Sequence, residues 1–222
     1  MIIEQTLENL GARQCSGYYV YMRELSKHSL LKDPIEQFRK WQQEASDSGG
    51  HRLSSMSLAT AGTDGNPSIR TVLLKGVSDE GFVFYSNYNS EKGRQIKENP
   101  RASILFYWEN LKRQVRVRGN VDKLSEAESD EYFQSRPRGA QIGAVASPQS
   151  ERIDNRAELE DRYRMIARKF RGMLIDRPNN WGGYRLVPKS LEFWQGRNDR
   201  LHDRFLYNLE EAGIWSKERL AP

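Results

Sequence analysis

The chain has 222 residues, 37% of them hydrophobic and 29% charged, which is typical of one globular domain with or without extensions. Its 35 basic and 30 acidic residues give a net charge of +5, and because the basic residues are scattered, this balance favours a small phosphorylated ligand over a nucleic acid. The single cysteine excludes an intrachain disulfide, and the three widely separated histidines exclude a common zinc motif. No apolar stretch is long enough for a membrane-spanning helix. We therefore expect a cytoplasmic protein without a metal.

The N-terminal segment shows no clear periodicity and contains a cluster of tyrosines, so we expect an arm or lid over residues 1–30. The remaining residues, 31–222, contain no linker or internal repeat, and we expect them to form a single domain. A helix is predicted at the start of this domain. Asp33 can cap it, and Pro34 suits the first helical position.

Alternating apolar and polar residues then predict a series of strands. Asp64 and Gly65 provide the turn between the first two strands, and a short charged helix is predicted over residues 90–99. Successive strands joined by short connections indicate an antiparallel sheet or a barrel. The predicted strands span residues 55–61, 68–77, 81–87, 101–108 and 114–124.

The last hundred residues predict helices followed by strands. Ser125 begins a helix with a capping box, because Glu128 follows three residues later, and Pro137 ends that helix. A longer amphipathic helix is predicted over residues 154–171. Three further strands are predicted over residues 182–196, 200–209 and 213–222. The expected fold class is therefore mainly β with α, a β-barrel with added helices.

The sharpest chemical pattern lies in the predicted strand over residues 200–209. In an extended strand, Arg200, His202 and Arg204 project from one face, because they are two residues apart. Two guanidiniums beside an imidazole suit an anionic or electron-rich ligand, and Trp194 upstream offers a flat surface for a ring. An exposed polar strand face, with His202 merely hydrogen-bonded, explains the pattern equally well.

Two more groups of polar residues precede this pattern. Arg70 and Lys75 are five residues apart, so both can reach one ligand only if the strand contains a bulge or ends before Lys75. Tyr85 and Ser86 end a strand, and Lys92 lies at the start of the next helix, where helix N–H groups can bind a phosphate. Solvated edge charges and an ordinary capped helix are the alternatives.

A fourth group lies near the predicted capping-box helix. Tyr132 and Arg136 are at positions i and i+4, where a hydroxyl and a guanidinium could hold one phosphate, although a surface pair would have the same spacing. Gln114, Gln149 and Ser150 are polar residues among apolar neighbours and indicate little by themselves. The sequence contains no glycine-rich dinucleotide motif and no P-loop motif.

Taken together, these segments resemble the pyridoxine/pyridoxamine 5′-phosphate oxidase family. The resemblance covers residues 33–222 and includes the motifs IRTVLLKG, FVFYSNYNSEKG, RPRGAQIGA, EFWQG, RLHDRF and ERLAP. It implies an FMN-binding split β-barrel that forms a homodimer with two FMN sites at the subunit interface. It also implies that pyridoxine or pyridoxamine 5′-phosphate is oxidised to pyridoxal 5′-phosphate with O2 as acceptor, releasing hydrogen peroxide and, from the amine, ammonia.

The resemblance assigns roles to residues of this chain. Flavin contacts would be Arg70, Thr71, Val72, Leu73, Leu74, Lys75, Tyr85, Ser86, Lys92, Gln114, Gln149, Ser150, Trp194 and Arg204. Substrate contacts would be Lys75, Tyr132, Arg136, Arg200 and His202. Arg200 and His202 would orient the substrate and stabilise its charge, and they are the expected catalytic residues.

Two residues depart from the family pattern. Glu91 stands where an arginine is common, so this carboxylate either turns away from the FMN phosphate or weakens FMN binding. Ala140 stands where a serine is frequent, so one hydrogen bond to the substrate phosphate would be absent. Two alternatives remain open: a related phenazine-pathway flavin oxidase, and a protein that binds flavin or pyridoxal phosphate without turnover.

Overall fold

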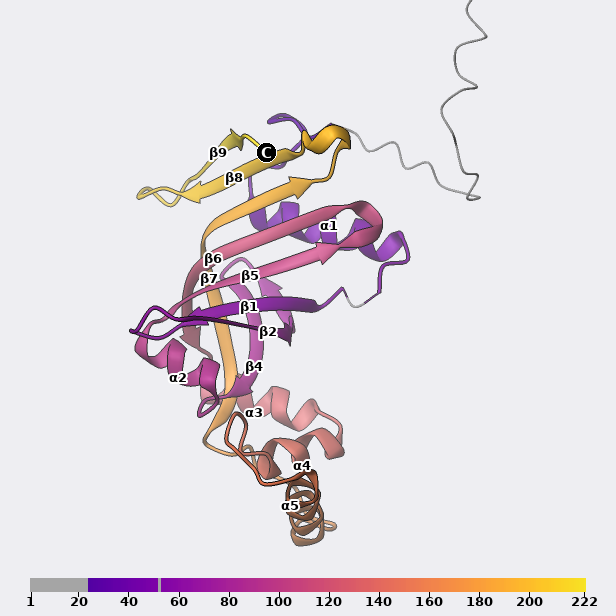
Figure 1. Ribbon diagram of the computed structural model, residues 1–222, viewed down its shortest axis with the longest axis vertical. Helices are drawn as coiled ribbons and strands as arrows, with labels where there is room; N and C mark the ends of the chain where they lie inside the picture. Colours follow the sequence, from indigo (N-terminus) through magenta and orange to yellow (C-terminus); the bar gives the residue numbers. More distant parts are fainter. Residues whose placement is uncertain (1–23, 52) are drawn as a thin grey trace, which may run out of the picture.

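The computed structural model describes residues 24–51 and 53–222 (Figure 1). Most of the expected arm lies outside these described residues, so the arm and its boundary with the expected single domain stay predictions. The end of its predicted span is tied to the body of the molecule. The backbone N–H of Leu25 donates to the Asp203 carboxylate at 3.2 Å, and the Leu30 side chain is buried.

The described residues form one antiparallel sheet in the order β2-β1-β5-β6-β7-β4-β3, with β8 beside β7 and β9 beside β8. This arrangement confirms the predicted mainly β fold with added helices. The strands are β1 (Ser55–Ala61), β2 (Pro67–Leu73), β3 (Gly76–Ser78), β4 (Gly81–Asn87), β5 (Arg101–Trp108), β6 (Arg113–Lys123), β7 (Trp181–Gln195), β8 (Asp203–Leu209) and β9 (Trp215–Leu220).

Strand β7 is the longest element of the sheet, with 15 residues. Its first half pairs with β4, its last six residues pair with β8, and β6 runs beside most of its length. The β6–β7 register shifts between Arg118 and Gly119. A Cβ atom at Gly119 would lie 2.0 Å from the carbonyl oxygen of Val187, so a glycine is required where β7 approaches the bulge.

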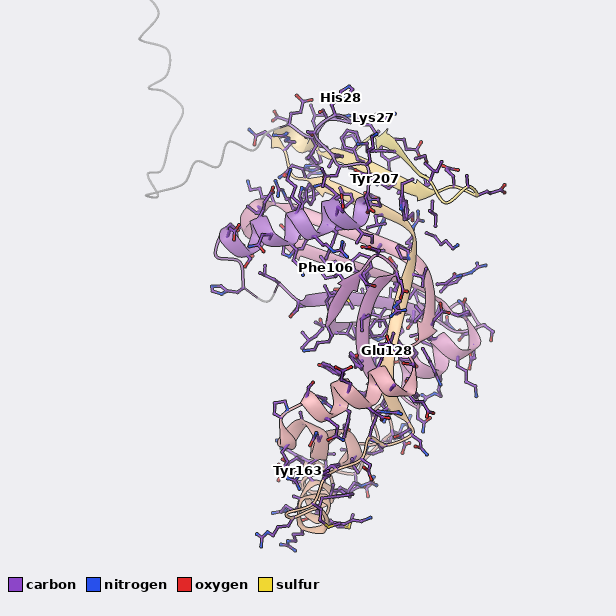
Figure 2. All side chains as sticks on the ribbon, turned by 180° about the vertical axis from the view of Figure 1, so that it is seen from behind. Lys27, His28, Phe106, Glu128, Tyr163 and Tyr207 are labelled. Carbon is purple, nitrogen blue, oxygen red and sulfur yellow. The ribbon has the colours of Figure 1, made fainter. Side chains whose placement is uncertain are left out.

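Helix α1 (Pro34–Asp47) closes one side of the main core. Asp33 caps it as predicted, because its carboxylate accepts from the backbone N–H of Ile35 at 2.6 Å. Phe38 is fully buried, and its ring centroid lies 4.8 Å from that of Phe106 on β5. Figure 2 shows Phe106 between the helix and the strands. Burial of these aromatic side chains is a main stabilising contribution to the core.

Four further helices lie beside or below the lower part of the sheet in Figure 1: α2 (Glu91–Glu98), α3 (Glu126–Ser135), α4 (Arg138–Ala146) and α5 (Arg156–Lys169). Helices α3, α4 and α5 group at the end of the molecule away from β8 and β9. The capping box at Ser125 is confirmed. The helix predicted over residues 154–171 is also confirmed, but none of its residues is fully buried, and Figure 2 shows Tyr163 in the lower part of the molecule. No helix in the described part of the chain is long and apolar enough to cross a membrane.

The strand predicted over residues 200–209 begins three residues late. Asn198–Arg200 form a short 3-10 turn, and β8 starts only at Asp203. Asp199 and Arg200 have φ angles of 53° and 61°, in the left-handed region that a strand does not use. The prediction that Arg200, His202 and Arg204 project from one strand face is therefore wrong. Hydrogen bonding by the buried Asp203 carboxylate, which accepts from Arg197 at 2.8 Å, holds this loop in place of a strand.

Candidate functional site

A cavity of about 1040 Å³ opens between the end of β2, β4, the start of α2 and the α3–α4 connection. It collects predicted residues from four separate segments of the sequence. They are Arg70, Thr71, Val72, Leu73, Lys75, Tyr85, Ser86, Lys92, Tyr132, Arg136, Gln149 and Ser150. We call these residues the cavity group.

The segment from Arg70 to Lys75 reaches the cavity because β2 ends at Leu73. Lys75 therefore lies beyond the regular strand, and its position no longer follows the two-residue alternation that would put it opposite Arg70. Leu74 is the exception within this run. Its side chain is 6% exposed and belongs to the main core, so any contact of Leu74 with a cofactor would involve its backbone.

Lys92 forms a buried cationic end of the cavity. It lies in the first turn of α2, it is 7% exposed, and its Nζ donates to Ser90 Oγ at 3.1 Å and Gln149 Oε1 at 3.3 Å. Ser86 Oγ donates to the same Gln149 oxygen at 3.2 Å. Burial, and then the neighbouring charge of Arg70, lower the pKa of Lys92. An anion placed here would relieve both effects, and the N-terminus of α2 adds further attraction.

Glu91 lines the same end of the cavity and does not turn away from it. Its Oε1 accepts from Ser68 Oγ at 2.9 Å, and its Oε2 lies 3.7 Å from Nη2 of Arg70. The Arg70 guanidinium also donates to Thr60 Oγ1 at 2.6 Å and to Ser68 Oγ at 2.6 Å. Arg70 is therefore already held by its own chain, and Glu91 partly neutralises it.

Three stacked aromatic rings form another wall. The Tyr85 and Tyr132 centroids are 3.8 Å apart at an interplanar angle of 18°, and Trp181 lies parallel to both. Lys75 Nζ is 5.8 Å from the Tyr132 centroid, and the Arg136 guanidinium is 4.6 Å from that of Trp181. These cation–π contacts hold both positive charges against the stack.

Arg136 differs from its sequence prediction in one respect. Helix α3 ends at Ser135, and Arg136 has an extended backbone, so it does not share a helix face with Tyr132. Both residues nevertheless reach the cavity. Nη1 of Arg136 is buried without a hydrogen-bond partner among the described residues, and burial lowers the pKa of this guanidinium. A buried donor of this kind needs an acceptor, which an anionic ligand would supply.

This lining fits a planar ligand that carries phosphate. Arg70, Lys75, Lys92 and Arg136 bring four positive charges against the one carboxylate that the described lining contains, Glu91. The unpaired Arg136 donor and the buried Lys92 ammonium mark two places for anionic groups. The described residues contain no group of three or more His, Cys, Asp or Glu side chains that could hold a metal ion.

Another set of predicted residues lies away from the cavity. Gln114 on β6, Trp194 on β7 and Arg204 on β8 are direct neighbours across the sheet, and we call them the strand row. Arg200 and His202 belong to the loop before β8. The His202 ring centroid is 4.6 Å from that of Trp194, and its Nδ1 accepts from the backbone N–H of Arg197 at 3.0 Å. None of these five residues lines the cavity of its own chain.

Sequence reasoning missed three residues of these regions. Trp181 completes the aromatic stack, Glu192 bonds to Arg204 of the strand row, and Asp203 holds the loop that carries Arg200 and His202. Two of them are acids at strand positions with less than 5% exposure. For Glu192, an acid within the otherwise apolar stretch from Leu191 to Trp194 is the signal that could have indicated a buried ion pair. Asp203 has polar neighbours on both sides, so the sequence carries no such signal for it.

Comparisons with known proteins give the same assignment for both halves of the chain. Residues 43–168 match the family described as pyridoxamine 5′-phosphate oxidase, and residues 181–222 match the pyridoxine 5′-phosphate oxidase C-terminal dimerisation region. The pyridoxine/pyridoxamine 5′-phosphate oxidase of Rubrobacter xylanophilus is 54% identical over 89% of this chain and 91% of its own length. The enzyme of that name from Salinibacter ruber is 52% identical over 90% of this chain and 94% of its own. The chain belongs to the pyridoxine/pyridoxamine 5′-phosphate oxidase family.

Membership of this family confirms the expected flavin enzyme, with FMN as its cofactor, and the dimerisation region indicates a dimer. Among solved structures, PhzG from Burkholderia lata in complex with tetrahydrophenazine-1-carboxylic acid has a TM-score of 0.82, at 30% identity over 86% of this chain and 94% of its own. A pyridoxamine 5′-phosphate oxidase-related, FMN-binding protein from Nostoc punctiforme has a TM-score of 0.68 at 20% identity over 86% of this chain and 98% of its own, and it supports the split-barrel fold alone.

Proposed function

We propose that this chain oxidises the 4′ carbon of pyridoxine 5′-phosphate or pyridoxamine 5′-phosphate to give pyridoxal 5′-phosphate, with FMN as cofactor and O2 as final electron acceptor. The observation that carries the proposal is the cavity, where the buried Lys92 ammonium and the half-buried Arg136 guanidinium, with its buried Nη1, occupy two places beside a flat aromatic wall. Two anionic positions suit a flavin phosphate and a substrate phosphate in one site. The more than 50% identity to oxidases of this name supports the same reaction.

The cavity group would divide between the two ligands. We assign the flavin phosphate to Lys92, Ser86 and Arg70 at the start of α2, where the helix N-terminus adds attraction. We assign the substrate phosphate to Arg136 and Tyr132, with Lys75 touching both ligands. The FMN, when bound, supplies the redox chemistry by accepting a hydride from the substrate.

The strand row and its loop would complete the site from the partner subunit. Gln114, Trp194 and Arg204 do not reach the cavity of their own chain, although the family resemblance assigns them to the flavin. A homodimer with two-fold symmetry can place the row of each subunit against the cavity of the other. This arrangement agrees with the match of residues 181–222 to a dimerisation region.

Arg200 and His202 would then orient the substrate over the flavin. A backbone N–H can only donate, so His202 Nδ1 is unprotonated, and the ring proton lies on Nε2. This Nε2–H can donate to an oxygen of the substrate, while Arg200 stabilises negative charge. The alcohol loses a hydride and a proton to become the aldehyde. The amine loses the same to become an imine, which water hydrolyses to the aldehyde and ammonia.

The test is to incubate the purified protein with FMN and pyridoxine 5′-phosphate and to measure the aldehyde and hydrogen peroxide. We expect equal amounts of both products, a yellow dimer and release of FMN rather than FAD on denaturation. Pyridoxine without phosphate is the matched control and should react poorly, because Arg136 lacks its ligand. Without oxygen, substrate should bleach the flavin. A yellow protein that is not bleached would be a binding protein without turnover.

The phenazine-pathway alternative rests on the similarity to PhzG. That protein is 30% identical, whereas the pyridoxine/pyridoxamine oxidases exceed 50% identity over a similar share of the chain. Faster oxidation of a reduced phenazine carboxylate than of pyridoxine 5′-phosphate would favour this alternative.

A further inference from the structure

Glu192 is a buried acid that has no role in the proposed reaction. It lies on β7, only 3% of it is exposed, and its carboxylate is shared between two arginines on the neighbouring strands. Glu192 Oε2 accepts from Arg116 Nη2 on β6, and Oε1 accepts from Arg204 Nε on β8 at 2.9 Å. Removing an acid from such a place is costly, because it leaves two positive charges side by side.

The sheet register explains why this acid reaches Arg204. Arg116 is directly opposite Glu192, and Arg204 is directly opposite Trp194. Residues two apart on a strand share a face, so Glu192 lies beside the strand row on the same side of the sheet. Arg204 therefore crosses diagonally to the carboxylate, a contact that adjacent antiparallel strands allow.

The Arg204 guanidinium is held at two of its nitrogens. Nε donates to Glu192, and Nη1 donates to the Ala221 carbonyl at 2.9 Å. No described residue accepts from Nη2, so one edge of the planar group stays available to a ligand. A guanidinium fixed in advance loses less freedom on binding than a mobile one does.

We propose that Glu192 is a positioning residue that orients Arg204 toward FMN, and that Arg116 keeps the Glu192 carboxylate in place for this purpose. The inference rests on the proposed contact between Arg204 and the flavin. It predicts that the effect of Glu192 on FMN binding passes through Arg204, whereas a merely structural acid would act independently of it.

The test is a double-mutant cycle on the full-length dimer, with FMN affinity measured by flavin fluorescence during titration of the apoprotein. Glu192→Gln places an amide NH2 against one of the two guanidiniums and should weaken FMN binding by about 10-fold. In an Arg204→Leu background the same change should have less than about a 2-fold effect, because the group to be oriented is gone. Light scattering should find a dimer for every variant.

The matched control is Ser190→Ala. Ser190 lies two residues earlier on the same face of β7, is also buried, and accepts from Arg118 Nε at 3.2 Å without touching Arg204. It should leave FMN affinity within about 2-fold of the unmodified protein. Equal effects of Glu192→Gln with and without Arg204, or loss of the dimer in Glu192→Gln, would overturn the proposal. If Arg204→Leu alone binds FMN normally, the assignment of Arg204 to the flavin fails as well.

Discussion

Glu91 is the acidic side chain in a cavity wall that otherwise carries positive charge. Its contacts with Ser68 and Arg70 hold it beside the place that we assign to the flavin phosphate. If the flavin phosphate binds there, as we propose, the carboxylate would compete with it for Arg70 and repel it. The sequence left two possibilities for Glu91. The structure shows that this side chain is not turned away from the cavity, so weakened FMN binding is the possibility that we predict.

We predict that Glu91→Arg tightens FMN binding by about 1 kcal/mol or more, because the change removes a like charge and adds a cation near the phosphate. Glu91→Gln should give a smaller gain. Fluorescence titration of the apoprotein measures both. Riboflavin, which has no phosphate, is the control ligand, and a similar gain for riboflavin would show that Glu91 acts on packing rather than on charge.

Arg200 and Arg204 are close in sequence but differ in their surroundings. Arg200 is exposed in a loop with a positive φ, whereas Arg204 is fixed within β8 by Glu192 and Ala221. We predict that Arg200→Leu keeps FMN but lowers kcat/KM, because substrate orientation is lost. The expected decrease corresponds to a loss of about 2–4 kcal/mol of transition-state stabilisation. Arg204→Leu should instead weaken FMN binding, so that the purified protein carries less FMN.

Steady-state kinetics and flavin content measured on both variants test this division. Normal kcat/KM in Arg200→Leu would remove its substrate role. Loss of flavin from both variants would mean that loop and strand serve the cofactor together. The chemical types of these residues could be predicted from the sequence, but their shared strand face could not. The buried Asp203 and the left-handed residues before it override the alternation that the sequence indicates.

At the scale of elements, the loop before β8 depends on Asp203. This carboxylate accepts from Arg197 Nε at 2.8 Å, from Arg219 Nη1 on β9 at 2.8 Å and from the backbone N–H of Leu25. Burial by itself would raise the pKa of Asp203, but the hydrogen bonds from these three groups together lower it below its ordinary value. One side chain thus joins the N-terminal segment, the loop and the last strand.

A lowered pKa means that Asp203 stabilises the fold when it is charged. The stabilisation by charged Asp203 is complete above the ordinary aspartate pKa of about 4. It is lost as the pH falls through the lower pKa that Asp203 has in the folded state. We predict that Asp203→Asn lowers the free energy of unfolding by about 1–3 kcal/mol at pH 7, and that this deficit shrinks only below about pH 4.

Urea unfolding of the unmodified protein and of Asp203→Asn, at the same protein concentration and between pH 8 and pH 3, measures this deficit in the free energy of unfolding. Asp161, an exposed aspartate paired with Arg164 on α5, supplies the control variant Asp161→Asn, which should change stability little. A deficit that closes between pH 6 and pH 8 would point to a histidine instead of Asp203.

The elements themselves followed local signals to different degrees. Helix α1 was predictable because Asp33 and Pro34 mark its start, and the capping box of Ser125 marked α3. Helix α4 was missed, since its glycines and small residues give almost no apolar periodicity. It packs in a cluster with Phe133 and with Ile175 and Trp181, and the last two are distant in the sequence, so no local pattern contains them.

For the whole molecule, the separation of the cavity group from the strand row is the main consequence of the fold. We predict that two inactive variants regain enzymatic activity when their subunits combine in a mixed dimer. Arg136→Leu damages the cavity, and Arg200→Leu damages the loop. In a mixed dimer, one site receives both defects and the other receives none. Random mixing should recover about a quarter of the normal activity, since half of the dimers are mixed and each has one intact site.

Co-refolding the two variants and measuring aldehyde formation tests this prediction, and each variant refolded alone is the control. Absence of any recovery in verified mixed dimers would place each site within one subunit. The sequence could predict the residues of both groups but not their separation. Which residues meet across a subunit interface depends on the surface shape of the assembled fold, and strand alternation says nothing about it.

Strand β7 begins with Trp181 in the cavity wall and ends at Trp194, which belongs to the strand row, and Gln195. In the proposed dimer, each β7 thus has its first residue in one active site and its last residues in the other. Its contour, about 45 Å for 15 residues, is the length of backbone that links the two reaction centres. An insertion of a single residue in β7 would shift one centre relative to the other and reverse the faces of the residues beyond it.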